Sequence, residues 1–120
     1  MSHLPPFPAS RPRRMRRDAF SRELMREHRL SPGNFILPVF VIDGEKRVQD
    51  IPSMPGVQRM TIDRLLGVAE EAQALGVPAL ALFPAIEPAL KTPDGAEALN
   101  PQGLVPRTVR ALKKQFPTWA

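Results

Sequence analysis

The sequence predicts an α/β protein, and three features of the chain lead to that class. Residues 35–42 are an apolar run of strand length, rich in β-branched and aromatic side chains, and residues 77–83 are a second apolar run. Between them, residues 61–75 carry apolar side chains at helical spacing. Two buried strands joined by a helix form a β-α-β unit, in which the strands lie parallel in one sheet.

An extended arm and a helix are expected before this unit. Four prolines in the first twelve residues prevent a continuous helix there, so residues 1–12 are predicted to be extended. Asp18 is a candidate N-cap. The side chains that follow share one helical face: Phe20, Leu24, Met25 and His28. This helix is expected to end at Ser31-Pro32-Gly33.

The first predicted strand, residues 35–42, is expected to be buried on both faces, as in a parallel sheet. Pro38 opposes this assignment, because proline cannot donate to a ladder and usually marks an edge or a bulge. From Gly44 to Met60 the chain reads as a loop, with a small hairpin around Val48 as one option.

The second helix has clear signals at both ends. Thr61 can cap its start, and Gly76 suits the position just past its end. The second strand, residues 77–83, is expected to stop at Pro84.

A long loop, residues 85–103, leads to a third helix from about Leu104 to Phe116. Loops of this length are usually functional or disordered. The apolar stripe of the third helix is predicted from four residues: Val105, Val109, Leu112 and Phe116.

Two parallel strands cannot cover their own faces, and stable sheets usually have about four to six strands. The chain has 120 residues, the length of one ordinary domain. A complete (β/α)₈ barrel needs ~250 residues, about twice as many. The sequence shows no internal repeat that would let the strand pair stack on copies of itself. These residues are therefore expected to open a larger domain.

The composition excludes several classes of protein. Apolar residues make up 42% and charged residues 24%, which disfavours both wholesale disorder and a membrane protein. The longest apolar run, residues 35–42, is far below the ~20 residues that span a bilayer. The chain has no cysteine, so it offers no disulfide and no thiolate metal site, which is compatible with the cytoplasmic location that we expect.

The positive charge lies in the first quarter of the chain. Residues 1–30 contain eight arginines and three acidic residues, whereas residues 31–120 contain nine basic and nine acidic residues. We therefore expect residues 1–17 to form a basic N-terminal arm, and residues 18–120 to hold the helix and the strand–helix units. Such an arm suits phosphates, anionic lipid or carboxylates of a partner protein.

No catalytic residue is predicted in the chain. The four lysines fall in polar loops or near a helix end: Lys46, Lys91, Lys113 and Lys114. His3 and His28 are the two imidazoles, and a surface position is expected for His28. The acidic pairs Glu70–Glu71 and Asp43–Glu45 are read as solvated.

Five segments occur in an order and spacing that resemble the N-terminal portion of porphobilinogen synthases, also called 5-aminolevulinate dehydratases, from about Arg11 to Pro117. They are residues 13–21 (RRMRRDAFS), 37–41 (LPVFV), 51–57 (IPSMPGV), 79–84 (ALALFP) and 97–103 (EALNPQG). The third segment, with two prolines and a glycine, is the most distinctive. The family also carries a proline at the place of Pro38.

This resemblance implies the N-terminal part of a TIM (β/α)₈ barrel preceded by an arm that wraps a neighbouring subunit. Members of the family condense two 5-aminolevulinate molecules to porphobilinogen with loss of two waters, in tetrapyrrole and haem synthesis. They use lysines that form Schiff bases, and zinc or magnesium assists. The two lysines and the metal ligands of the family lie beyond the point that corresponds to Ala120. We therefore assign no catalytic, cofactor-binding or metal-binding residue here, and expect an inactive fragment of a lyase.

The resemblance implies a role in subunit contact for five residues of the arm region: Arg13, Arg14, Arg16, Arg17 and Phe20. Their arginines would pair with carboxylates of another copy in a homo-oligomer. The first alternative is an arm that is solvated and contacts no partner. A small interaction protein whose basic arm binds RNA is the alternative from another functional class, and it ranks second because no aromatic-rich stacking surface accompanies the arginines.

Overall fold

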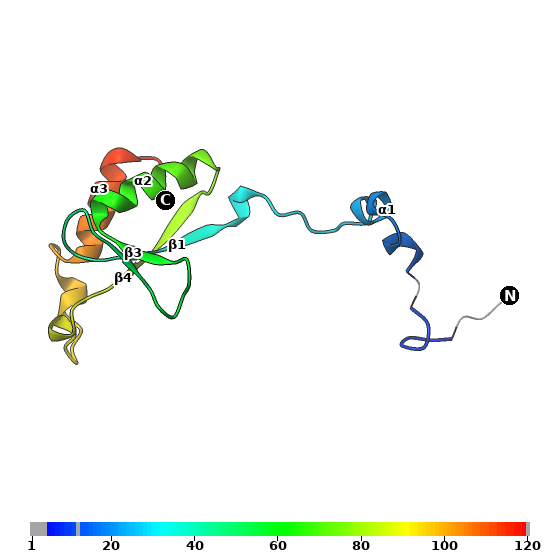
Figure 1. Ribbon diagram of the computed structural model, residues 1–120, viewed down its shortest axis with the longest axis horizontal. Helices are drawn as coiled ribbons and strands as arrows, with labels where there is room; N and C mark the ends of the chain where they lie inside the picture. The colour runs from blue at the N-terminus through cyan, green and yellow to red at the C-terminus, as the bar shows by residue number, and fades with distance from the viewer. Residues whose placement is uncertain (1–4, 12, 120) are drawn as a thin grey trace. The chain divides into compact units, whose positions relative to one another are not determined.

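The computed structural model describes residues 5–11 and 13–119. The chain divides into two compact units, Met1–Leu30 and Ser31–Ala120. The smaller unit contains the 3-10 turn η1 (Arg14–Arg16) and helix α1 (Ala19–Leu24), and the larger unit contains the sheet and two longer helices (Figure 1).

Helix α1 is shorter than the sequence pattern predicts. Asp18 is its N-cap as expected, and the Ser21 hydroxyl donates to the Asp18 carbonyl oxygen at 3.0 Å. The expectation that the helix continues to Ser31 is wrong, because α1 ends at Leu24. Phe20 and Leu24 are 68% and 73% exposed, so this helical face finds no apolar partner among the described residues of its unit. A short helix without such packing is marginal.

The larger unit holds a four-stranded sheet in the order β2-β3-β1-β4. Its strands are β1 (Ile36–Val41), β2 (Val48–Asp50), β3 (Gln58–Met60) and β4 (Ala79–Pro84). The predicted neighbouring parallel strands are confirmed, since β1 pairs with β4 in parallel from Ile36↔Ala79 to Val41↔Pro84. The hairpin around Val48 also forms, as β2 and β3 are antiparallel. It supplies the two strands that raise the sheet from two strands to four.

The sheet accommodates Pro38 because of where β3 ends. β3 pairs with β1 only at Phe40 and Val41, so β1 is an edge strand on that side at Pro38. On the other side Pro38 lies opposite Ala81 of β4. The missing N–H of Pro38 therefore breaks no hydrogen bond between β1 and β3, and β1 continues past Pro38.

Two helices cover one face of the sheet. Helix α2 (Ile62–Ala74) begins after Thr61 and is followed by Gly76, whose φ of +83° is the left-handed conformation expected past a helix end. Helix α3 (Leu104–Gln115) lies beside α2 (Figure 1). Two buried clusters hold this layer together: Val39, Val41, Leu65 and Leu104, and Ala69, Ala72, Phe116 and Trp119.

The buried face of α3 includes Leu112 and Phe116 of the predicted stripe but not Val109. Val109 is 41% exposed, whereas Thr108 is fully buried. The side chains that face the sheet follow the spacing of Leu104, Thr108 and Leu112. The Thr108 hydroxyl donates to the Leu104 carbonyl oxygen at 2.7 Å, so a polar side chain is buried there with its hydrogen bond made.

The opposite face of the sheet is open among the described residues. Ile36 is 64% exposed and Phe83 is 50% exposed. The rings of Phe40 and Phe83 lie on this face with their centroids 5.6 Å apart. The prediction that residues 35–42 are buried on both faces is therefore wrong for this structure, because helices cover only one face. None of the helices in the described part of the chain has the length and apolar character needed to cross a membrane.

Candidate functional site

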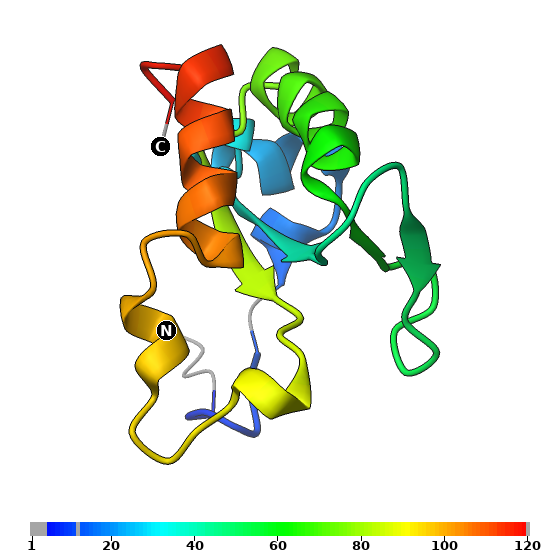
Figure 2. The same cartoon turned by 90° about the vertical axis from the view of Figure 1, so that its left-hand side faces the viewer.

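A polar cavity lies at the carboxyl ends of the parallel strands β1 and β4. Both strands end at the same edge of the sheet, and the loop of residues 85–103 continues from β4 there (Figure 2). The cavity has a volume of about 420 Å³. Its polar lining comes from three segments: Asp43 after β1, Glu87, Glu97, Asn100 and Gln102 in the loop, and Arg107 in α3. Ligand sites of parallel α/β proteins usually lie at this edge.

An ion pair borders one side of this cavity. The Arg107 Nη2 atom donates to the Asp43 Oδ2 atom at 2.7 Å. Asp43 lies two residues past β1, and Arg107 lies in the first turn of α3. The backbone N–H of Gly44 donates to the other carboxylate oxygen of Asp43 at 2.8 Å.

These two hydrogen bonds lower the pKa of Asp43 below its ordinary value of 3.8, with the Arg107 contact the larger cause. Slight burial opposes the shift without reversing it. A lowered pKa means that the pair stabilises the folded state above pH 3.8 and that this contribution is lost as the pH falls through the folded-state pKa. Asp43 is therefore ionised at neutral pH.

Replacing Arg107 by glutamine is expected to raise the pKa of Asp43 toward its ordinary value. The Gly44 N–H still donates to the carboxylate, so the return is expected to be partial. An NMR titration of the Asp43 carboxyl carbon between pH 2 and pH 6 measures the effect, with Arg110→Gln as the matched control. An Asp43 midpoint that is equal in the two variants contradicts the assignment of the pair.

The loop wall of the cavity is held by local hydrogen bonds. The Asn100 Nδ2 atom donates to the Glu97 carboxylate at 3.1 Å, and the Gln102 N–H donates to Asn100 Oδ1 at 2.9 Å. A Cβ atom at Gly103 would lie 2.9 Å from Glu97 Oε1 and 3.1 Å from the Asn100 carbonyl oxygen, so a larger residue would require both the Glu97 side chain and the Asn100 backbone to shift. Both 3-10 turns of this segment, Pro88–Leu90 and Ala96–Leu99, add order to the predicted long loop.

The cavity offers polar binding groups but no amine nucleophile. Its described lining contains carboxylates, amides and one guanidinium group, without lysine, serine or histidine. The Arg107 Nε atom is buried and has no hydrogen-bond partner in the described structure. Such a lining can hold a polar ligand, whereas a Schiff base needs an amine from elsewhere.

The structure places the lysines away from this cavity. Lys46 and Lys91 are exposed in loops, and Lys114 is exposed on α3. The Lys113 Nζ atom donates to the Trp119 carbonyl oxygen at 2.5 Å, near the end of α3. Within residues 5–11 and 13–119, no group of three or more histidine, aspartate or glutamate side chains is arranged to hold a metal ion. The described residues therefore do not fit the zinc or magnesium that the resemblance implies.

The other titratable candidates lie on the surface. Glu70 and Glu71 are exposed on α2, and His28 is exposed beyond α1. His3 lies outside the described residues. The sequence reading of Asp43 as solvated misses its ion pair, which joins residues 64 positions apart. The sequence held a signal for this contact. Asp43 follows the first predicted strand, and Arg107 lies in the first turn of the helix that follows the second predicted strand. In a β-α-β unit these two positions lie at the same edge of the sheet.

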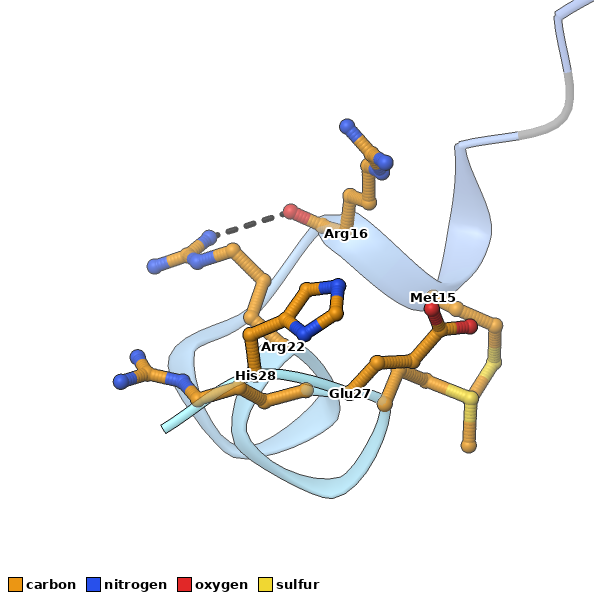
Figure 3. Close-up of a pocket in the computed structure, with 7 residues that line it drawn as sticks. Met15, Arg16, Arg22, Glu27 and His28 are labelled. Atoms are coloured by element: carbon orange, nitrogen blue, oxygen red, sulfur yellow. Dashed lines mark hydrogen bonds between the residues drawn. The ribbon is translucent and has the colours of Figure 1, made fainter. Parts of the chain in front are cut away.

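A second cavity, of about 450 Å³, lies within the smaller unit. Figure 3 shows Arg22 donating to the carbonyl oxygen of Arg16, at 3.0 Å, while the Arg16 side chain extends away from His28. The arginines that line this cavity therefore do not converge on one point. The five arm residues named from the resemblance are all exposed: Arg13, Arg14, Arg16, Arg17 and Phe20.

The fold and the polar cavity define an α/β protein with a candidate site at the carboxyl ends of its parallel strands. The family model of delta-aminolevulinic acid dehydratase matches residues 9–120. The chain belongs to the delta-aminolevulinic acid dehydratase family. The resemblance of the sequence to the N-terminal portion of these proteins is thereby confirmed.

Two curated relatives and one solved structure illustrate the match. The delta-aminolevulinic acid dehydratase of Bradyrhizobium diazoefficiens is 45% identical over 109 residues, which cover 91% of this chain and 31% of the relative. The chloroplastic enzyme of Selaginella martensii is 46% identical over 109 residues, covering 90% of this chain and 26% of the relative. The crystal structure of the Toxoplasma gondii ME49 enzyme in complex with the reaction product porphobilinogen matches with a TM-score of 0.83 and 41% identity, over 92% of this chain and 31% of that chain. The chain thus spans about a third of the length of such relatives.

Proposed function

We propose that this chain supplies the first part of a porphobilinogen synthase, the lyase that condenses two 5-aminolevulinate molecules to porphobilinogen with loss of two waters. The observation that carries the proposal is 45% identity over 91% of the chain with a curated member of the family. The reaction would serve tetrapyrrole and haem synthesis. We also propose a cytoplasmic location, for which the absence of cysteine is the only support.

In this proposal the sheet is the first part of a TIM (β/α)₈ barrel. Residues 1–17 form the basic arm, and residues 18–120 form the first helix and the first two strand–helix units. Two features of the described part of the larger unit support a partial barrel: its helices cover one face of the sheet, and the other face is apolar and exposed at Ile36 and Phe83. The inner face of a barrel is filled by side chains from all its strands.

The 120-residue chain is proposed to be inactive by itself. The family reaction needs lysines that form Schiff bases, and none of the lysines of this chain lines the cavity. A Schiff-base lysine must be neutral at working pH, which needs desolvation or a neighbouring cation. Zinc or magnesium would have to be held by residues outside the described part of this chain.

A chimera tests this function directly. The matched 109-residue segment of the Bradyrhizobium diazoefficiens relative is replaced by the corresponding residues of this chain. We expect the chimera to form porphobilinogen from 5-aminolevulinate, because residues that share 45% identity should pack against the rest of the relative. The 120-residue chain assayed alone is expected to form none.

Product formation is followed colorimetrically, and circular dichroism shows whether each protein is folded. A chimera that folds but forms no porphobilinogen, with the unaltered relative active in parallel, contradicts the proposed function. Turnover by the 120-residue chain alone contradicts the proposal that the Schiff-base lysines are absent from it.

The arm region is proposed to contact another subunit in a homo-oligomer. The smaller unit combines eight arginines with exposed Phe20, Leu24 and Met25, and it contains no lysine. Arginine, methionine and aromatic residues are enriched at protein interfaces, and lysine is depleted there. This composition favours a protein partner over RNA for Arg13, Arg14, Arg16, Arg17 and Phe20.

A further inference from the structure

The ion pair between Asp43 and Arg107 lies beside a cavity that three segments of the chain line. Asp43 follows β1, Arg107 belongs to α3, and both halves of the 85–103 loop line the space beside them. Figure 2 shows this loop beneath the carboxyl end of β4, before α3 begins. The pair therefore links the end of β1 to the helix into which the loop leads.

Folding by itself does not account for this pair. The Asp43 side chain is 69% exposed and that of Arg107 is 38% exposed, and ion pairs at such exposure contribute little to stability. The Arg107 Nε atom is buried without an acceptor, which opposes folding. The guanidinium group is thus held toward Asp43 although one of its own donors stays unsatisfied.

The first residue of the loop is fixed to β1, because the Ala85 N–H donates to the Val41 carbonyl oxygen at 2.7 Å, and the rest of the loop has few such ties. Its hydrogen bonds are mostly local, such as Gly95 N–H to the Thr92 carbonyl oxygen at 3.0 Å and Gly103 N–H to the Asn100 carbonyl oxygen at 3.0 Å. Arg110 Nη2 donates to Gln102 Oε1 at 3.2 Å on the same helix as Arg107, and Arg110 does not line the cavity. Arg107 instead ties the first turn of α3 to the end of β1 through Asp43, and its backbone N–H donates to the carbonyl oxygen of Gly103, the last residue of the loop, at 3.1 Å.

We propose that Arg107 is a positioning residue: by pairing with Asp43 it fixes the 85–103 loop as the wall of a ligand cavity at the carboxyl ends of β1 and β4. This inference rests on the proposed function for its kinetic consequence. The wall contacts the bound ligand equally before and during reaction, so its loss raises KM and leaves kcat nearly unchanged.

The kinetic test uses the active chimera with Arg107→Gln, Asp43→Asn, the double variant, and the exchanged pair Asp43→Arg with Arg107→Asp. Each single variant is expected to raise KM about fivefold, the upper end of what an ion pair at this exposure contributes. The double variant is expected to resemble either single variant, and the exchanged pair to recover most of the loss. Lys114→Gln, at an exposed position on the same helix, is the matched control and is expected to leave KM within about twofold.

A second measurement does not depend on activity. In the 120-residue chain, Arg107→Gln is expected to accelerate amide hydrogen exchange in residues 85–103 about fivefold, whereas Lys114→Gln leaves the exchange of the loop unchanged. Equal exchange in the two variants overturns the positioning role, even if the chimera proves inactive and the proposed function fails. An active chimera whose Arg107→Gln variant keeps its KM overturns it as well, as does a fall in thermal midpoint with no change in KM.

Discussion

The 120-residue chain is expected to associate at micromolar concentration through the open face of its sheet. Ile36, Phe40 and Phe83 lie together on the face that no described helix covers. Contiguous exposed apolar surface of this kind marks an interface or an aggregation site. Replacing Ile36 and Phe83 by lysine is expected to weaken association about 100-fold or more, because burying an unpaired ammonium group costs several kcal/mol.

Sedimentation velocity over a concentration series measures this association. The control variant places lysines at Val48 and Leu75, which are also exposed apolar residues but lie outside this face, and it should still associate. In the chimera the substitutions at Ile36 and Phe83 are expected to abolish activity, since the proposed barrel buries both side chains. A native chain that stays monomeric and melts cooperatively would falsify this and would favour a self-contained interaction protein.

Replacing Leu65 by alanine is expected to lower the free energy of unfolding by about 2–5 kcal/mol. Leu65 is fully buried in α2 and packs with Val39, Val41 and Leu104, so its side chain joins both layers of the larger unit. Truncation removes apolar contacts and leaves a cavity that the surrounding strands and helices can only partly close.

Urea unfolding followed by the fluorescence of the single tryptophan measures this loss, in the background of Ile36→Lys and Phe83→Lys. Trp119 packs edge-on against Phe116 and its Nε1 atom donates to the Val77 carbonyl oxygen at 2.8 Å, so it reports on the same layer. Leu99→Ala, at an exposed position, is the matched control and should change stability by less than about 0.5 kcal/mol. Equal effects at the two leucines contradict the packing described for Leu65.

Sequence reasoning predicts the larger unit well because its signals are local. Thr61 and Gly76 bound α2 as expected, and the apolar runs at 35–42 and 77–83 become β1 and β4. Sequence reasoning fails where a helix or strand depends on the segment that packs against it. α1 stops at Leu24 because no described residue of its unit packs on its apolar face, and α3 turns Thr108 rather than Val109 inward.

The candidate site shows the same limit. The residues of the ion pair could be picked out from the sequence, since Asp43 and Arg107 lie near the ends of predicted elements. Their contact, at 2.7 Å across 64 positions, depends on the register between β1 and β4 and on how α3 packs. Neither the strand register nor the packing of α3 can be read from the spacing of apolar residues or from turn residues.

The sequence by itself determined the α/β class, the parallel neighbours and the family, because backbone capping, apolar runs and ordered motifs are properties of short segments. Only the tertiary structure decided which face of the sheet is covered, which face of α3 is buried, and that an ion pair borders the polar cavity. These features arise from contacts between distant segments. Their free energy depends on the distance and burial of both partners, which no single stretch of sequence contains.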